Sequence, residues 1–201
     1  MHLILLPVIA YLLGAVPWGA VVVRVCTGKD IRRQGSGNIG ATNVRRIAGG
    51  RAAAATLLLD MLKGALPVML AVWFVRDGAG APLYISLTAM AAFVGHCYPV
   101  YTRFKGGGKG VATALGSFLV IAPFAALIAV LVFVMILCFF GRVSLGSMTG
   151  AAVLPVAVWQ ATHSTIFALL GTVFLLLILL RHRDNLVRLA KGEEPSVFRK
   201  G

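Results

Sequence analysis

The chain has 201 residues, of which 59% are hydrophobic and only 12% are charged. A soluble domain usually carries about 25% charged residues, so this composition excludes a water-facing globule and indicates that lipid is the solvent. The apolar runs are continuous rather than alternating, which predicts spanning helices. The net charge is +13. Because the basic residues lie between the apolar runs, most of this charge is explained by the collection of Lys and Arg in cytoplasmic loops, not by nucleic-acid binding.

The N-terminal segment is apolar from Leu3 to Val23, and its first basic residue, Arg24, follows the run. No basic region precedes the run, as it would in a signal peptide. This order predicts that the N-terminus lies outside and the first loop inside. The three cysteines form no CxxC pair and are interpreted as structural.

The stretch 111–140 is 30 residues long and would make a helix of about 45 Å, more than one crossing needs. Pro123 lies within it and is expected to break the helix. A division at this proline also places the basic residues before and after the stretch on the same side. The helices are therefore expected at 3–23, 52–75, 83–101, 111–121, 123–140, 143–160 and 163–180.

The sequence thus predicts an all-α integral membrane protein, a single domain over 1–201, with seven transmembrane helices. The N-terminus is outside and the C-terminus is cytoplasmic. On this topology every Lys and Arg except Lys63 and Arg76 lies inside. A six-helix alternative, with 111–140 as one tilted span, would divide the basic loops between the two sides. The expected cytoplasmic segments are 24–51, 102–110, 141–143 and the tail 181–201.

The first expected cytoplasmic loop contains Gly35-Ser36-Gly37-Asn38-Ile39-Gly40-Ala41-Thr42-Asn43-Val44-Arg45-Arg46. Its Gly-x-Gly-x-x-Gly spacing matches a dinucleotide fingerprint, but the βαβ unit that such a fingerprint needs is missing. Glycines let backbone N–H groups approach an anion, and an Arg guanidinium fits phosphate. The alternatives are a phosphate-binding loop and a flexible turn, and the accumulated Asn and Thr favour the former.

The second loop reads Lys105-Gly106-Gly107-Gly108-Lys109-Gly110 and directly precedes a predicted helix. It is not a Walker A loop, because Gly110 stands where Ser or Thr should follow the lysine. A glycine-rich loop that opens a helix still presents free N–H groups and the positive end of the helix dipole to an anion. The simpler alternative is a flexible basic loop that only sets topology.

Polar residues also occur in the tail and inside one apolar run. The tail segment 181–194 combines basic residues with an apolar face, as in an interfacial helix. Asp60 and Lys63 are three residues apart in a helix and could pair; structural pairing and support of a site are equally good interpretations. His96 is interpreted as structural. No HEXXH, GxSxG or His-x4-Asp motif and no carboxylate cluster for Mg²⁺ is present, so no metal site and no cofactor are expected.

Three segments together resemble the bacterial acyl-phosphate:glycerol-3-phosphate acyltransferase family. They are GSGNIGATN at 35–43, KGGGKGVAT at 105–113 and RHRDNLVRLAKGEE at 181–194. The helix pattern and length agree as well, so the resemblance covers essentially the whole chain. One departure is that three glycines separate Lys105 from Lys109 where the family has two, which leaves the register of Lys105 open.

The resemblance implies transfer of a fatty acyl group from acyl phosphate to the sn-1 hydroxyl of glycerol 3-phosphate. The products would be 1-acylglycerol 3-phosphate (lysophosphatidic acid) and phosphate, in the first step of bacterial phospholipid synthesis. The expected catalytic residues are Ser36, Lys109, His182 and Asn185. The expected substrate- and phosphate-binding residues are Asn38, Thr42, Asn43, Arg46, Lys105, Gly106, Gly107, Gly108 and Glu193.

For His182 two roles are open, a general base or a helix-end cap, and a substrate phosphate oxygen could take the proton instead. An acyl-Ser36 intermediate is less favoured, because no base lies beside Ser36 in sequence. The expected partners are the two substrates and membrane lipids, with an acyl-phosphate-forming enzyme upstream and no nucleic acid. The chain is expected to act as a monomer in the bacterial inner membrane, with its site facing the cytoplasm. The rival function is transport of phosphorylated metabolites, which would favour an internal repeat and polar groups at mid-membrane.

Overall fold

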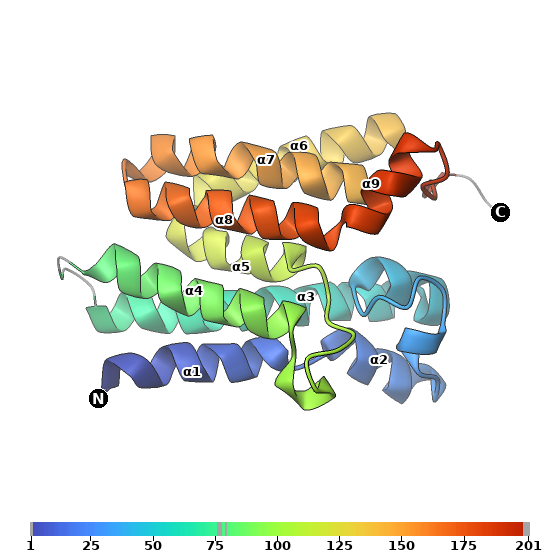
Figure 1. Ribbon diagram of the computed structural model, residues 1–201, viewed down its shortest axis with the longest axis horizontal. Coiled ribbons are helices and arrows are strands. Elements are labelled where there is room, and N and C mark those ends of the chain that lie inside the picture. Colours follow the sequence, from blue (N-terminus) through green and yellow to red (C-terminus); the bar gives the residue numbers. More distant parts are fainter. Residues whose placement is uncertain (1, 76–77, 79, 199–201) are drawn as a thin grey trace. The chain divides into compact units, whose positions relative to one another are not determined.

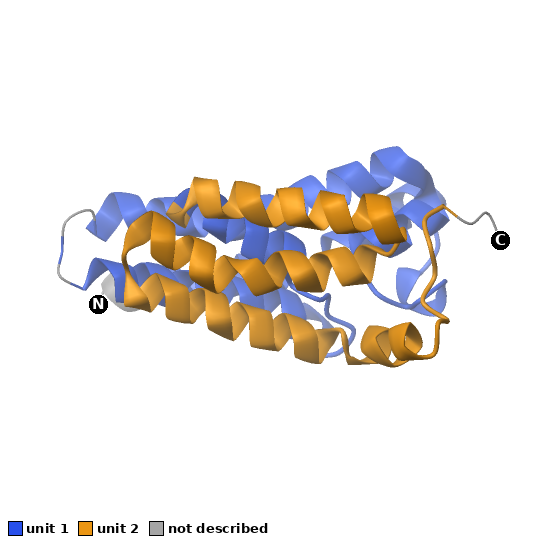
Figure 2. Cartoon of the chain, turned by 90° about the horizontal axis from the view of Figure 1, so that it is seen from above, with its two compact units in different colours: residues 1–120 blue, residues 121–201 orange. Residues whose placement is uncertain are grey.

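The computed structural model describes residues 2–75, 78 and 80–198. These residues form helices joined by turns, and none of them is in a strand. The chain divides into two compact units, Met1–Val120 and Ile121–Gly201 (Figure 2). Each unit is described by itself.

The first unit begins with two short helices rather than one long one. α1 (His2–Ala15) and α2 (Trp18–Thr27) are separated at Val16-Pro17. A residue before proline is disfavoured in the helical region, and Pro17 has a ψ of 71°. The expectation of one helix over 3–23 is therefore wrong on two points: the helix breaks at Pro17, and it continues to Thr27.

The other elements of the first unit place the glycine-rich segments at one end. η1 (Ile31–Arg33) is followed by α3 (Ala41–Val75), α4 (Ala81–Cys97), η2 (Val100–Thr102) and α5 (Val111–Ile121). α1 packs on α4 and α3, and α2 packs on α3. In Figure 1 the stretch between α4 and α5 lies at the same end of this unit as α2 and the turn into α3.

α3 begins well before the residue expected from hydropathy. The segment 24–51 was expected to be a loop, but residues from Ala41 onward are helical. Gly49 has φ 84° and ψ 179°, which places a kink between a short basic helical segment and the long apolar one. The loop expectation is wrong here because hydropathy reports only the apolar part of a helix, whereas the short segment before Gly49 is polar.

The second unit contains α6 (Pro123–Phe140), α7 (Val143–Thr162), α8 (Thr165–Arg181) and α9 (Arg183–Ala190). α7 packs on both α6 and α8. The expected division of 111–140 is confirmed: α5 ends at Ile121, and Ala122 leaves the helical region with φ −150° directly before Pro123.

Five of these elements are long and apolar enough to cross a bilayer within the described residues: α1 with α2, α3, α4 with η2, α6 and α7. α8 passes that test only together with α9, across a bend of 63°. α5 has 11 residues, about half the length of a full crossing. The multispanning all-α class is confirmed, whereas the count of seven crossings and the orientation of the termini stay predictions.

Candidate active site

The first glycine-rich loop is organised around the buried side chain of Asn43. Its Oδ1 accepts a hydrogen bond from the backbone N–H of Ser36 at 3.1 Å. Its Nδ2 donates to the carbonyls of Gln34 at 3.1 Å and Asn38 at 2.9 Å. Because both N–H bonds of the amide are donated to loop carbonyls, Asn43 holds the loop backbone in its turn conformation.

The other polar residues of this loop either bind the loop backbone or are exposed to solvent. Asn38 Oδ1 accepts from the backbone N–H of Gly40 at 2.8 Å, which closes the turn into α3. Ser36, Thr42 and Arg46 are exposed. Among the residues expected in this loop, these three are therefore the ones available to contact a ligand.

The turn conformation explains the glycines of the first loop. Gly35 and Gly37 have φ values of 56° and 69°, in the left-handed region that favours glycine. A Cβ on Gly35 would also overlap with the Asn43 carboxamide. The loop is anchored on an apolar cluster made by Val23, Ile31, Ile39, Val44 and Ala52.

The second loop lies directly against the last turn of α4. The N–H of Gly108 donates to the carbonyl of His96 at 3.1 Å. A Cβ on Gly107 would overlap with the Cys97 carbonyl, and a Cβ on Gly108 would overlap with the His96 ring. Gly110 has φ 83° and faces the Phe93 ring. The glycines are therefore required by close packing, and the interpretation of a merely flexible loop does not fit.

The second loop leads into the N-terminus of α5. The first helical hydrogen bond runs from the N–H of Ala114 to the carbonyl of Gly110. The N–H groups of the residues between them have no partner earlier in the helix, which is the arrangement that binds anions. Lys105 is exposed and Lys109 is half-buried beside this helix end. This geometry suits a phosphate group.

Arg32 connects the two loops. Arg32 belongs to η1, directly before the first loop, and a Cβ on Gly37 of that loop would lie 3.1 Å from the Arg32 carbonyl oxygen. A Cβ on Gly106 of the second loop would lie 2.9 Å from Arg32 Nε, so the Arg32 side chain reaches the second loop. No sequence pattern distinguishes Arg32 from the other loop cations, because only the folded chain places it beside Gly106. Two glycine-rich loops and an exposed arginine therefore meet in the first unit.

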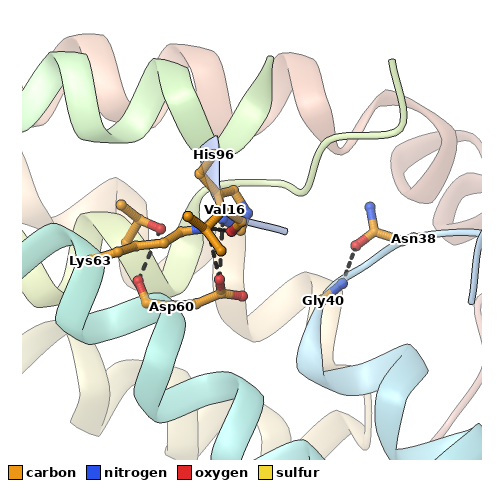
Figure 3. A network of polar contacts seen from close by, with 7 residues as sticks. Val16, Asn38, Gly40, Asp60, Lys63 and His96 are labelled. Atoms are coloured by element: carbon orange, nitrogen blue, oxygen red, sulfur yellow. Dashed lines mark hydrogen bonds and ion pairs between the residues drawn. The ribbon is translucent and has the colours of Figure 1, made fainter. Parts of the chain in front are cut away.

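A buried polar cluster lies behind the second loop (Figure 3). Lys63 Nζ is 2.8 Å from Asp60 Oδ1, which confirms the expected pairing. His96 Nδ1 is 3.6 Å from the same oxygen. Lys63 also donates to the carbonyl of Val16 at 2.9 Å, at the break between α1 and α2. His96, expected to be structural, therefore joins this cluster to the second loop.

The tail of the second unit is held by Glu194. Its Oε1 accepts from Ser144 Oγ and from Asn185 Nδ2, each at 2.6 Å, and its Oε2 accepts from Arg188 Nε at 2.8 Å. Burial raises the pKa of Glu194, but the hydrogen bonds from Ser144, Asn185 and Arg188 outweigh it and hold the pKa below its ordinary value. Asn185, expected in the site, is thereby fixed in orientation.

Glu193 and Glu194 have different environments. Glu193, the glutamate expected in the site, is exposed. Glu194 carries the network, and sequence reasoning missed it together with Ser144 and Arg188. Two adjacent glutamates cannot be told apart by composition, and Ser144 is 50 residues away in the chain.

His182 ends α8 and is buried. Its Nδ1 lies 2.8 Å from the carbonyl of Ile178. A carbonyl only accepts, so Nδ1 is the donor and the neutral ring carries its lone pair on Nε2. The hydrogen bond at the helix end is therefore present, and the tautomer it selects carries the lone pair of the ring on Nε2.

The described residues contain no group of three or more His, Cys, Asp or Glu side chains placed to hold a metal ion. The charged groups of both loops are cations. The chemistry that the described site residues offer is thus binding of anionic oxygens by N–H groups and guanidinium.

The chain is similar to known proteins along almost its whole length. The glycerol-3-phosphate acyltransferase family matches residues 4–192. The glycerol-3-phosphate acyltransferase of Syntrophotalea carbinolica is 46% identical over 185 residues, 92% of each chain. The enzyme of the same name from Myxococcus xanthus is 44% identical over 189 residues, covering 94% of this chain and 96% of that one.

Two solved structures are also similar. Both are crystal structures of PlsY (YgiH), described as an integral membrane glycerol 3-phosphate acyltransferase. The glycerol 3-phosphate form has a TM-score of 0.91 and 37% identity, covering 98% of this chain and 96% of that one. The lysophosphatidic acid form has a TM-score of 0.87 and 36% identity, covering 98% and 95%. With the loops and apolar helices described above, these matches show that the chain belongs to the glycerol-3-phosphate acyltransferase family of integral membrane enzymes.

Proposed function

We propose that this glycerol-3-phosphate acyltransferase uses acyl phosphate as its donor. The acyl group goes to the sn-1 hydroxyl, and the products are 1-acylglycerol 3-phosphate and inorganic phosphate. The observation that carries the proposal is that Arg32 lies beside Gly37 of the first loop and beside Gly106 of the second. Two adjacent anion-binding loops suit a reaction in which both substrates carry a phosphate group.

The proposed reaction is a direct acyl transfer. The sn-1 hydroxyl oxygen attacks the acyl carbonyl carbon, the bond from that carbon to the phosphate oxygen breaks, and phosphate leaves with the bonding electrons. The hydroxyl proton passes to a base, for which His182 Nε2 is the candidate, or to a phosphate oxygen. Because an acyl phosphate is already activated, positioning and charge stabilisation supply most of the catalysis.

The roles of the loop residues follow from their exposure and charge. We assign Lys105, Lys109, the segment Gly106–Gly108 and the N–H groups at the start of α5 to one phosphate; the N–H of Gly108 itself is held by the His96 carbonyl and supports the loop. Ser36, Thr42 and Arg46 are assigned to the other phosphate and the glycerol. Asn38 and Asn43 support these residues through the loop backbone.

The enzyme is proposed to act as a monomer in the bacterial inner membrane, with its site on the cytoplasmic side and an acyl-phosphate-forming enzyme upstream. The distribution of Lys and Arg supports this orientation. It is tested with Gly80→Cys and Lys191→Cys, each in a variant without Cys26 and Cys138, the two exposed cysteines. A membrane-impermeant maleimide added to intact cells should label the former only; labelling of Lys191→Cys alone would reverse the orientation.

The donor is tested with purified enzyme, palmitoyl phosphate and radiolabelled glycerol 3-phosphate, without metal or CoA. We expect labelled lysophosphatidate from the wild type and loss of turnover in Lys109→Ala. The control Lys191→Ala, which removes an exposed lysine of the tail, should keep the turnover of the wild type. Product formed only from acyl-CoA or acyl carrier protein would contradict the acyl-phosphate proposal. Failure of all three donors would turn attention to flux of phosphorylated metabolites in liposomes.

A further inference from the structure

The buried cluster of Asp60, Lys63 and His96 is more than one ion pair. All three side chains are at most 4% exposed, and one carboxylate oxygen, Asp60 Oδ1, faces both potential cations. Ionisable groups at membrane depth are costly, and a neutral pair of Asp60 and Lys63 would be the cheapest arrangement. Charge neutralisation by Lys63 therefore does not explain why the His96 ring also lies against Asp60.

His96 provides that explanation through two contacts with the second loop. Its carbonyl accepts from the N–H of Gly108 at 3.1 Å. Its ring occupies the space that a Cβ on Gly108 would need. The position of the imidazole thus sets how closely the loop approaches α4, and Asp60 contacts that imidazole from the side of α3 (Figure 3).

Asp60 also holds the segment that follows the loop. Its backbone carbonyl accepts a hydrogen bond from Thr113 Oγ1, at 3.0 Å, in the first turn of α5. His96 precedes the loop and Thr113 follows it. The loop is therefore fixed at both ends on one residue of α3, and that residue is itself tied through Lys63 to the carbonyl of Val16.

We infer that Asp60 and His96 are positioning residues that set the location of the loop N–H groups toward a substrate phosphate. The inference rests on the proposed role of the second loop as a phosphate site. Hydrogen bonds to an anion weaken steeply with distance and angle. Displacement of the loop should therefore weaken binding of the substrate held there and leave the other substrate unaffected.

The kinetic parameters separate positioning from a structural role. A variant that is only less well folded has less active enzyme, so its Vmax falls and its KM values stay unchanged. A displaced phosphate loop raises KM for one substrate. The variants are His96→Gln and the double variant Asp60→Asn/Lys63→Met, which removes the carboxylate without leaving a buried unpaired ammonium.

Matched controls are available on the same helices. Thr56 on α3 and Thr88 on α4 are both buried, and among the residues that the structure describes their hydroxyls bond to carbonyls of their own helix, Ala52 and Tyr84. Thr56→Val and Thr88→Val should leave both KM values unchanged. For the two test variants we expect KM of one substrate to rise about tenfold with kcat within about twofold, as for loss of uniform binding.

A double-mutant cycle tests the contact itself. Gly108→Ala places a methyl group against the His96 ring, and His96→Ala removes that ring. We expect Gly108→Ala to lower kcat/KM at least about thirtyfold in the wild-type background and less than about threefold in the His96→Ala background. Equal effects in the two backgrounds would overturn the inference.

The outcomes also separate this inference from its premise. If Gly108→Ala raises KM for one substrate but the cluster variants lower only Vmax, the loop binds phosphate and the positioning role is wrong. If Gly108→Ala changes no KM, the loop is not a phosphate site and both proposals fail. A tenfold rise of the same KM in all three variants supports both.

Discussion

The side chain of Asn43 fixes the backbone of Ser36. Its Oδ1 accepts from the Ser36 N–H at 3.1 Å, while its Nδ2 binds the carbonyls of Gln34 and Asn38. A residue in the first turn of α3 thereby determines the shape of the loop that precedes the helix. Ser36 is exposed on this loop, and its position depends on the buried side chain of Asn43.

We expect Asn43→Asp to destabilise the protein much more than Asn38→Asp. The first change replaces two donors with a carboxylate that faces two carbonyls. A fully buried group left without a partner costs about 1–3 kcal/mol. Both hydrogen bonds are only partly buried, so the two lost partners together should lower the free energy of unfolding by about 2–4 kcal/mol. Asn38 uses its oxygen as an acceptor toward Gly40, and Asp keeps that oxygen.

Thermal unfolding of the two purified variants, followed by tryptophan fluorescence, measures this difference. Equal melting temperatures for Asn43→Asp and the wild type would show that the two hydrogen bonds donated by Asn43 Nδ2 do not hold the loop.

The sequence was most informative where a single residue constrains the backbone directly. Pro123 predicted the break between α5 and α6 because proline restricts the residue before it, and Ala122 shows that restriction. The same rule applies at Pro17, although Pro67 and Pro155 lie inside α3 and α7 without ending them, so a proline alone marks only a possible break. The break between α1 and α2 was missed because the apolar run continues through it and hydropathy does not register backbone geometry.

The sequence was least informative where distant residues meet. The contact of Arg32 with Gly106 and the bond of Ser144 to Glu194 depend on the tertiary fold, and no local pattern marks them. The pairing of Asp60 with Lys63 could be predicted because helical spacing brings them together. The third member of that cluster, His96, comes from another helix and could not be.

Glu194 should anchor the tail and Glu193 should not. Glu194→Gln keeps the size of the side chain but removes the charge that binds Arg188. A hydrogen bond to a charged group contributes about 1.5–3 kcal/mol, so hydrogen exchange of α9 should become at least about tenfold faster. Glu193→Gln is the control, because Glu193 is exposed and should leave the exchange rate unchanged.

Anchoring of the tail should also depend on pH. The pKa of Glu194 is lowered by its hydrogen bonds, so the stabilisation is complete above its ordinary value of 4.5 and is lost as the pH falls through the lower folded value. The protection factor of α9, which is its exchange rate corrected for the intrinsic pH dependence of amide exchange, should therefore fall on acidification below 4.5 in the wild type. Glu194→Gln should show no such step, and a step of equal size in that variant would assign it to another group.

Gly95 should be intolerant of any side chain. A Cβ there would overlap with the carbonyl of Tyr11, where α4 and α1 pack closely. Small residues allow such contacts between membrane helices, and overpacking costs about 1–3 kcal/mol. Gly95→Ala should therefore lower the melting temperature. Gly50→Ala is the control, since a Cβ at that helical glycine meets nothing within 4 Å and should add about 0.5–1 kcal/mol of stability.

His182 is expected to act as a base as well as a helix cap, and two substitutions separate these roles. Asn can present an N–H group near the position of Nδ1 and keep the hydrogen bond to the Ile178 carbonyl, whereas Gln places its amide nearer to Nε2. Neither amide can accept a proton at neutral pH. If Nε2 is the base, both variants should lose about 10²–10⁴-fold in kcat, the usual contribution of general base catalysis.

The melting temperature supplies the second measurement. His182→Asn should melt close to the wild type because the cap is retained, and His182→Gln should melt lower. A folded Asn variant with near-normal turnover would show that His182 only caps α8. The proton of the sn-1 hydroxyl would then pass to a phosphate oxygen of a substrate. The Ile178 carbonyl would remain only the hydrogen-bond partner of Nδ1, because a carbonyl oxygen is too weak a base to take up this proton.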